Sequence, residues 1–190
     1  MRTLRDDRGF TLAELIVVMG LLTVVIGVVY GSTFAMMQAS RVSDRQARFT
    51  KEVASPLLVI DTALVQNSSI LEASPFRVVM LMDRDLNNRM ERVTIEARDD
   101  GALHYRVEEL NAQRTAVERV LQDWTISENN ANVAEGVPLF RYFAAAPDEE
   151  ITAMGSVSSD ARSIIANVVT EHDGRTFSDS RRIQFRLRQW

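Results

Sequence analysis

The stretch Arg8-Gly9-Phe10-Thr11-Leu12-Ala13-Glu14-Leu15 ends a short charged leader and begins a long apolar run. The run carries one carboxylate, Glu14, and no further charge follows before Arg41. At about 1.5 Å rise per residue, a helix over residues 15–40 is long enough to span the ~30 Å hydrocarbon core of a bilayer. A carboxylate deep in a bilayer costs about 2.5–3.5 kcal/mol on insertion scales, so Glu14 is predicted to have a functional role.

Two ordinary kinds of membrane segment share part of this pattern. A secretory signal peptide has an apolar core of roughly 7–15 residues followed by a small-residue cleavage site, and residues 15–40 are uncharged over a longer stretch. A plain single-pass anchor accounts for the length. It does not account for an acid placed directly after Gly-Phe-Thr-Leu-Ala, so the pattern favours a specialised segment.

This N-terminus resembles that of type IV pilins and pseudopilins, which have a charged leader, then Gly-Phe-Thr-Leu-x-Glu, then an uninterrupted apolar helix. The resemblance implies that a prepilin peptidase cuts between Gly9 and Phe10 and that the same enzyme N-methylates Phe10. It gives Glu14 the role of pairing with the N-terminal amine of a neighbouring subunit. The expected segments are a leader over 1–9, a transmembrane and assembly helix over 10–40, and a soluble domain over 41–190.

The orientation of the membrane segment is not decided by its flanking charges. Basic residues lie on both sides of the run, at Arg2, Arg5 and Arg8 and at Arg41, Arg45, Arg48 and Lys51, so the positive-inside rule is ambiguous. The family's peptidase cuts on the cytoplasmic side. The resemblance therefore implies a single-pass protein of the cytoplasmic (inner) membrane, with its N-terminus in the cytoplasm and its soluble domain on the outer face.

Composition limits the function of the remaining chain. The 190 residues carry a formal net charge of −4 and no cysteine, and the pI is about 5.3. An acidic chain does not favour a general nucleic-acid-binding surface, so no nucleic-acid partner is expected. Without cysteine there is no disulfide, thiol nucleophile or cysteine-based metal site.

A helix is predicted to continue beyond the membrane run. Its apolar residues recur at three-, four- and seven-residue intervals, at Val42, Phe49, Val53, Leu57, Ile60 and Leu64. We expect this stripe to pack under a sheet, with a coiled-coil partner helix as the alternative. Pro56 should kink or restart the helix near Ser55, which could cap the new helix.

From Ser74 onward the pattern changes to short β-like runs. Strands are predicted over 76–82, 92–98, 103–107, 117–126, 139–144, 163–172 and 181–188, although the centre of 117–126 could also be helical. The turns Asp99-Asp100-Gly101 and Asp173-Gly174 each predict a hairpin. Residues 128–136 and 147–160 are expected to be polar loops. The predicted fold is α+β, a long N-terminal helix packed on an antiparallel sheet.

No catalytic set is evident, and no enzymatic activity, cofactor or metal is expected. His104 and His172 each lie within a predicted strand, which favours a structural role. Asp83, Asp85 and Asn87 have the spacing of the first three ligands of a calcium loop. The glycine and glutamate that such a loop needs further on are replaced by Asn88 and Thr94, so a polar turn is predicted instead.

Gly27 and Gly31 form a G-x-x-x-G pair within the apolar run, which permits close helix packing. Generic membrane-helix glycines are the simpler interpretation. Many pilins have a proline at the position of Gly31, so a proline-type break of the helix is not expected here.

The resemblance implies a structural subunit that assembles with other pilins or pseudopilins into a pilus-like filament. The J-type minor pseudopilin of type II secretion is the most similar subtype, through Leu57-Leu58-Val59-Ile60-Asp61 and Phe140-Arg141-Tyr142. A minor pilin of a type IV pilus and a DNA-uptake pseudopilin are alternatives. A monomeric membrane-anchored binding domain, uncut at Gly9, is the competing class.

Overall fold

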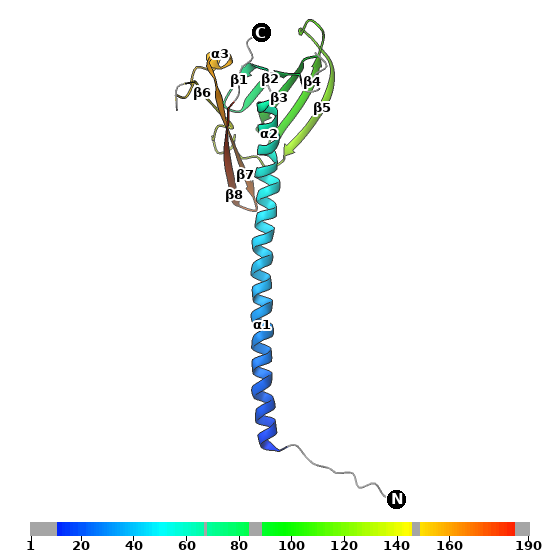
Figure 1. Ribbon diagram of the computed structural model, residues 1–190, viewed down its shortest axis with the longest axis vertical. Helices are drawn as coiled ribbons and strands as arrows, with labels where there is room; N and C mark the ends of the chain where they lie inside the picture. The colour runs from blue at the N-terminus through cyan, green and yellow to red at the C-terminus, as the bar shows by residue number, and fades with distance from the viewer. Residues whose placement is uncertain (1–10, 67, 84–88, 146–148, 185–190) are drawn as a thin grey trace, which may run out of the picture. The chain divides into compact units, whose positions relative to one another are not determined.

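The computed structural model describes residues 11–66, 68–83, 89–145 and 149–184. The chain divides into two compact units, Met1–Ala47 and Arg48–Trp190. The first unit holds most of helix α1, and the second holds two antiparallel sheets and the remaining helices (Figure 1). The predicted α+β class is confirmed.

Helix α1 runs from Leu12 to Phe49, and none of its residues is buried. Helix α1 is the first part of a continuous helix, Leu12–Val65, that is long and apolar enough to cross a membrane. Its apolar side chains are open, as at Val24 (65% exposed) and Val28 (67% exposed). Since a continuous apolar surface of this size is unfavourable in water, lipid or another chain must cover it.

After α1 the helix continues through a π-helical turn at Thr50–Ala54. It then continues as α2 at Ser55–Val65, which includes Pro56. The Ser55 amide donates to the Thr50 carbonyl, five residues earlier. This shifted hydrogen bond lies just before Pro56, which has no amide hydrogen to donate. The helix changes type next to Ser55, where a kink or restart was predicted, and Pro56 is the second residue of α2. The predicted cap is wrong, because Ser55 has helical dihedral angles (φ −66°, ψ −48°) and no side chain caps the start of α2.

The larger sheet has five antiparallel strands in the order β1-β2-β3-β4-β5. The strands are β1 (Ser69–Ala73), β2 (Arg77–Met82), β3 (Glu91–Ala97), β4 (Leu103–Leu110) and β5 (Val117–Ser127). The predicted Asp99-Asp100-Gly101 hairpin is confirmed, with Gly101 at φ +82°. Residues 117–126 are extended throughout. Strand β1 was not predicted, because Ile70 is its only buried residue and no alternation results.

The smaller sheet has the order β6-β7-β8, with β6 at Phe140–Phe143, β7 at Ser163–His172 and β8 at Arg175–Gln184. Asp173 and Gly174, with φ of 51° and 67°, form the tight turn of the predicted second hairpin. Strand β8 begins directly after this turn, six residues before the predicted start at Arg181. The predicted strand residues 185–188 lie outside the described residues.

The loop predicted over 147–160 contains two short helical turns, a 3₁₀ turn at Met154–Ser156 and α3 at Val157–Asp160. Val157 is fully buried, so this segment contributes to the core. Met154 is partly buried against the same core. Two apolar residues among glycine and serines are too few to show helical periodicity in the sequence.

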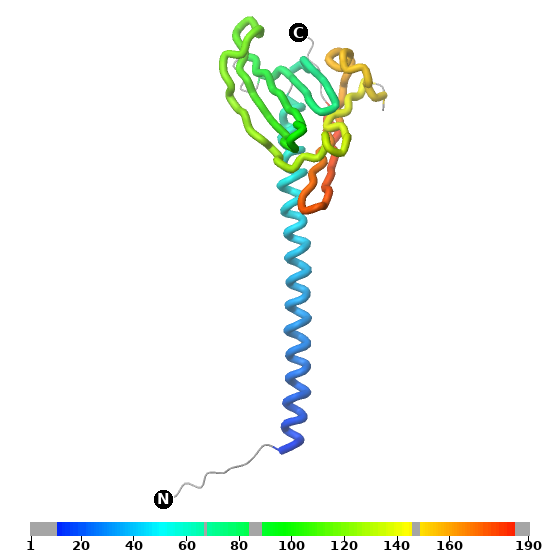
Figure 2. Tube along the Cα trace, turned by 180° about the vertical axis from the view of Figure 1, so that it is seen from behind, coloured from blue at the N-terminus to red at the C-terminus, as the bar shows by residue number. Residues whose placement is uncertain are grey.

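Helix α2 packs against both sheets, contacting β5 of the larger sheet and β7 and β8 of the smaller one (Figures 1 and 2). Val53, Leu57, Ile60 and Leu64 are each at most 3% exposed. Phe49 is partly buried and packs against the same core. The predicted stripe is therefore confirmed from Phe49 onward as the face of the helix that meets the core. Val42, its first predicted member, is 69% exposed and does not belong to this core.

Two ion pairs fix the β7–β8 hairpin on the helix within the second unit. Arg48 Nη1 lies 2.7 Å from Asp173 Oδ2, and Arg181 Nη1 lies 2.7 Å from Asp61 Oδ2. The hydrogen bond from Arg48, and to a lesser degree the charge of His172, lowers the pKa of Asp173. Because the Arg48, Asp173 and Arg181 side chains are each at least half exposed, the pairs set position more than they add stability.

Tyr142 joins the two sheets through a buried hydrogen bond. Its side chain is fully buried, and its hydroxyl donates to the Ser74 carbonyl at 3.0 Å. Burial raises the pKa of this phenol, so the hydroxyl stays protonated, and remains a donor, in alkaline solution as well as at neutral pH.

Tyr142→Phe is expected to lower the free energy of unfolding by about 1–3 kcal/mol, since the Ser74 carbonyl loses its buried donor. Urea unfolding measures this, and an unchanged midpoint at an unchanged slope would contradict it.

Candidate processing and assembly site

Thr11 and Glu14 cap the start of α1 reciprocally. The backbone amide and the hydroxyl of Thr11 both donate to Glu14 Oε2, each at 3.0 Å. In return, the Glu14 amide lies 3.3 Å from Thr11 Oγ1. The helix begins at Leu12, so Thr11 is the cap residue and Glu14 the third helical residue, which is the arrangement of a capping box.

The capping box changes the interpretation of Glu14. In the membrane run it is the one acid, yet its carboxylate already accepts two hydrogen bonds from its own chain. It also stands in the first turn, where a negative charge is favoured by the helix dipole. The Thr-x-x-Glu spacing in the sequence is that of a capping box and predicts this cap, in addition to the role expected from the charge of Glu14 in the apolar run.

The predicted cleavage residues, Gly9 and Phe10, lie outside the described residues. Thr11, the first described residue, directly follows Phe10, the predicted new N-terminus. Gly9, Phe10 and the role of Glu14 in pairing with a neighbour's amine therefore remain predictions.

Gly27 and Gly31 lie in α1, and a Cβ added at either position would meet nothing within 4 Å. Thr23 and Thr33 hydroxyls bond back to carbonyls of their own helix at 2.8 Å, so they need no external partner. The glycines thus mark a surface that a second helix could approach closely, and their packing role remains a prediction.

The histidines occupy strands, as predicted. His104 on β4 places Nε2 2.8 Å from Asp123 Oδ1, and Arg98 Nη2 lies 3.1 Å from its Nδ1. Nearby on the same strand, Arg106 forms an ion pair with Glu108. His172 on β7 lies 3.5 Å from Asp173. These contacts are those of charged strand surfaces.

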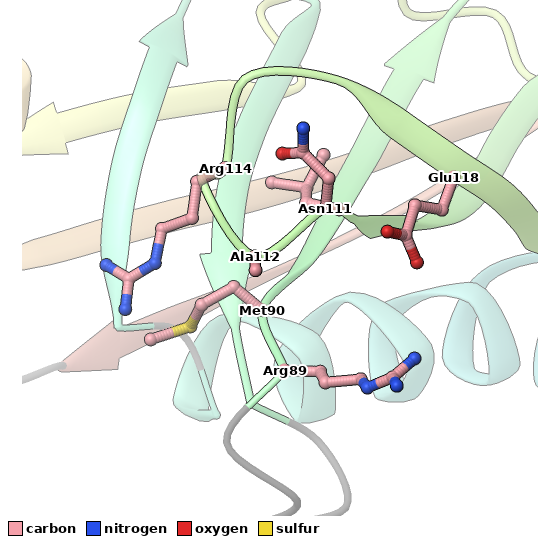
Figure 3. Close-up of a pocket in the computed structure, with 7 residues that line it drawn as sticks. Arg89, Met90, Asn111, Ala112, Arg114 and Glu118 are labelled. Atoms are coloured by element: carbon pink, nitrogen blue, oxygen red, sulfur yellow. The ribbon is translucent and has the colours of Figure 1, made fainter.

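One pocket of about 330 Å³ lies at the β4–β5 turn (Figure 3). It is lined by Arg89, Met90, Leu110, Asn111, Ala112, Arg114 and Glu118. Arg89 is paired with Glu109 at 2.7 Å, and the Asn111 side chain binds the turn residues Thr115 and Ala116. The Arg89 and Arg114 side chains point apart (Figure 3), so no convergent charged set forms.

Within the described ranges no three His, Asp or Glu side chains are grouped to hold a metal ion. Of the calcium-like series, Asp85, Asn87 and Asn88 lie outside those ranges. Asp83 and Thr94 are described, and Thr94 lies in strand β3, paired with Val79 and Arg106.

Comparison with known proteins places a family motif on this site. Residues 4–30 match the family model described as the prokaryotic N-terminal methylation motif. No curated protein and no solved structure matches the chain.

The chain thus carries a prepilin-type N-terminal motif, which spans the predicted cleavage site, the capping box and much of the exposed apolar helix. This motif supports a type IV pilin or pseudopilin, which is processed by a prepilin peptidase and assembles with other pilins. The apolar helix and the motif together point to a membrane-anchored structural subunit.

Proposed function

We propose that this chain is a minor pseudopilin, stored in the cytoplasmic membrane and assembled into a pilus-like filament for type II protein secretion. The observation that carries the proposal is the methylation motif over residues 4–30, on a helix with no buried residue, followed by an α+β domain with its own core. A chain that has both an exposed apolar helix and a separately packed domain is suited to a subunit that exchanges lipid for neighbouring helices.

The hydrophobic effect explains how such a subunit changes surroundings. While it is stored, lipid covers the apolar side chains of α1. In a filament, the same surfaces pack against the α1 helices of neighbours, so the apolar area stays out of water throughout. Gly27 and Gly31 would let those helices approach closely.

Glu14 would act mainly as a check on register. In the stored subunit Thr11 satisfies its carboxylate. In the filament the N-terminal amine of an adjacent subunit would supply an opposite charge in a low-dielectric setting. A buried pair of charges is tolerated, whereas one left alone is strongly disfavoured, so misaligned subunits would be rejected.

The mature N-terminus tests this proposal. Protein extracted from membranes of cells with an active prepilin peptidase is expected to lack residues 1–9 and to begin with N-methyl-Phe10. Intact-mass and N-terminal analysis measure both changes. A chain that retains its leader in such cells would contradict the proposal and favour a monomeric anchored domain.

A further inference from the structure

Arg41 and Arg45 are the first basic side chains after the uncharged run. They lie in α1, exposed and one helical turn apart, and therefore on one face of the helix. Neither guanidinium has an ion pair or side-chain hydrogen bond with any described residue. The next arginine differs, because Arg48 is bound to Asp173.

The length of the helix places this pair near a membrane surface. About 40 Å of helix separates Glu14 from Arg41, at ~1.5 Å per residue. A bilayer has a hydrocarbon core of about 30 Å and a total thickness of about 40–45 Å with its headgroups. If Glu14 marks one border of the core, Arg41 falls just beyond the opposite headgroups. Arg45 lies about 6 Å further out along the helix, at ~1.5 Å per residue. Helical side chains tilt toward the N-terminus, which directs both guanidinium groups toward the phosphates, with that of Arg41 the closer.

Charge distribution gives a second reason for a partner there. Once residues 1–9 are removed, no Lys or Arg precedes Arg41. With the N-terminus in the cytoplasm, the basic residues near the membrane lie on the outer side, against the usual positive-inside bias. Anions at the outer face of that membrane would stabilise the positive charges of exposed arginines in this position.

Phosphate is the anion that best fits the pair. The planar guanidinium fork of arginine binds phosphate oxygens in a bidentate manner, whereas lysine acts as a point charge. Asp44, also exposed, lies on the same turn and lowers the local net charge. Short-range bidentate contacts are therefore better suited to this site than long-range attraction.

We propose that Arg41 and Arg45 bind the phosphates of anionic phospholipids where α1 leaves the bilayer, and so hold the stored subunit at a fixed depth. The proposal rests on the membrane storage proposed above. Extraction into a filament would then require release of these lipids.

The test uses the full chain in vesicles. The chain has no cysteine, so Ser43→Cys, on the face opposite the arginine pair, accepts a single fluorophore. Vesicles contain phosphatidylcholine alone or with an equal part of phosphatidylglycerol, plus a trace of either lipid with a nitroxide headgroup. Quenching by labelled phosphatidylglycerol relative to labelled phosphatidylcholine measures local enrichment. We expect about fivefold enrichment, weakened by about 0.5 M salt.

Three variants separate the contributions. Arg41→Gln with Arg45→Gln should abolish the enrichment, and the same two positions changed to Lys should retain only part of it. Arg175→Gln, which removes one exposed charge from β8, should leave it unchanged.

The outcomes that overturn the proposal are distinct. A chain that does not float with the vesicles overturns both membrane storage and lipid binding. A chain that floats, with equal enrichment in the parent and the double Gln variant, overturns lipid binding alone. Loss of crosslinks to neighbouring subunits in that variant, with unchanged lipid enrichment, would assign the arginines to an acidic protein partner instead.

Discussion

Gly9→Val is expected to leave essentially all of the chain uncut. The predicted scissile bond follows Gly9, and we expect only a very small side chain to fit beside it. The apolar run is unchanged, so membrane insertion should be normal and the uncut protein should accumulate in the membrane. Immunoblotting and intact-mass analysis of membrane extracts measure the uncut fraction.

Gly20→Val is the matched control for this experiment. Gly20 lies inside α1, and a Cβ there would meet nothing within 4 Å. The same glycine-to-valine change should therefore leave cleavage after Gly9 intact. Equal cleavage of the two variants would show that the peptidase does not read Gly9, and it would remove the main reason for placing the cut there.

The sequence was most informative where one residue type has one structural use. Gly101 and Gly174 predicted both hairpins, because each lies at positive φ in a tight turn that strongly favours glycine. The stripe through Leu57 and Ile60 predicted the buried face of α2, because burial on one side imposes helical spacing.

Prediction failed where the structure depends on distant partners. Asn132 belongs to a segment expected to be a polar loop, yet it is fully buried. Its side chain donates to the carbonyls of Val137 and Asn167 and accepts from the Val169 amide. It thus replaces the missing backbone partners of β7, and nothing local in the sequence indicates which strand it will meet.

The candidate site shows both situations together. The Gly9-Phe10 motif was recognisable from a few residues, and residues 4–30 match the corresponding family model. The bond between Thr11 and Glu14 is equally local, because the Thr-x-x-Glu spacing at a helix start favours a capping box whether or not the glutamate also serves as a membrane charge. The Glu14 carboxylate has two possible partners, Thr11 of its own chain and the N-terminal amine of a neighbour. A variant that removes one of these interactions and keeps the other is needed to tell them apart.

Glu14→Ala is expected to weaken assembly strongly while cleavage after Gly9 continues. Insertion should become easier, since the one charge of the apolar run is removed. In the filament, the neighbour's N-terminal amine would then be buried without a partner, at a cost of about 3 kcal/mol or more. That corresponds to a loss of about a hundredfold in the assembly equilibrium. Crosslinking to partner subunits, with a secretion or piliation assay, measures the effect.

Glu14→Gln separates the charge from the cap. Glutamine can still accept from Thr11 and close a capping box, but it carries no negative charge. If assembly depends on pairing with an amine, the Gln and Ala variants should fail alike. Thr11→Val, which removes only the hydroxyl, should then assemble nearly as well as the parent. If Gln instead restores assembly and Thr11→Val impairs it, Glu14 acts by fixing the start of α1, and the pairing role is wrong.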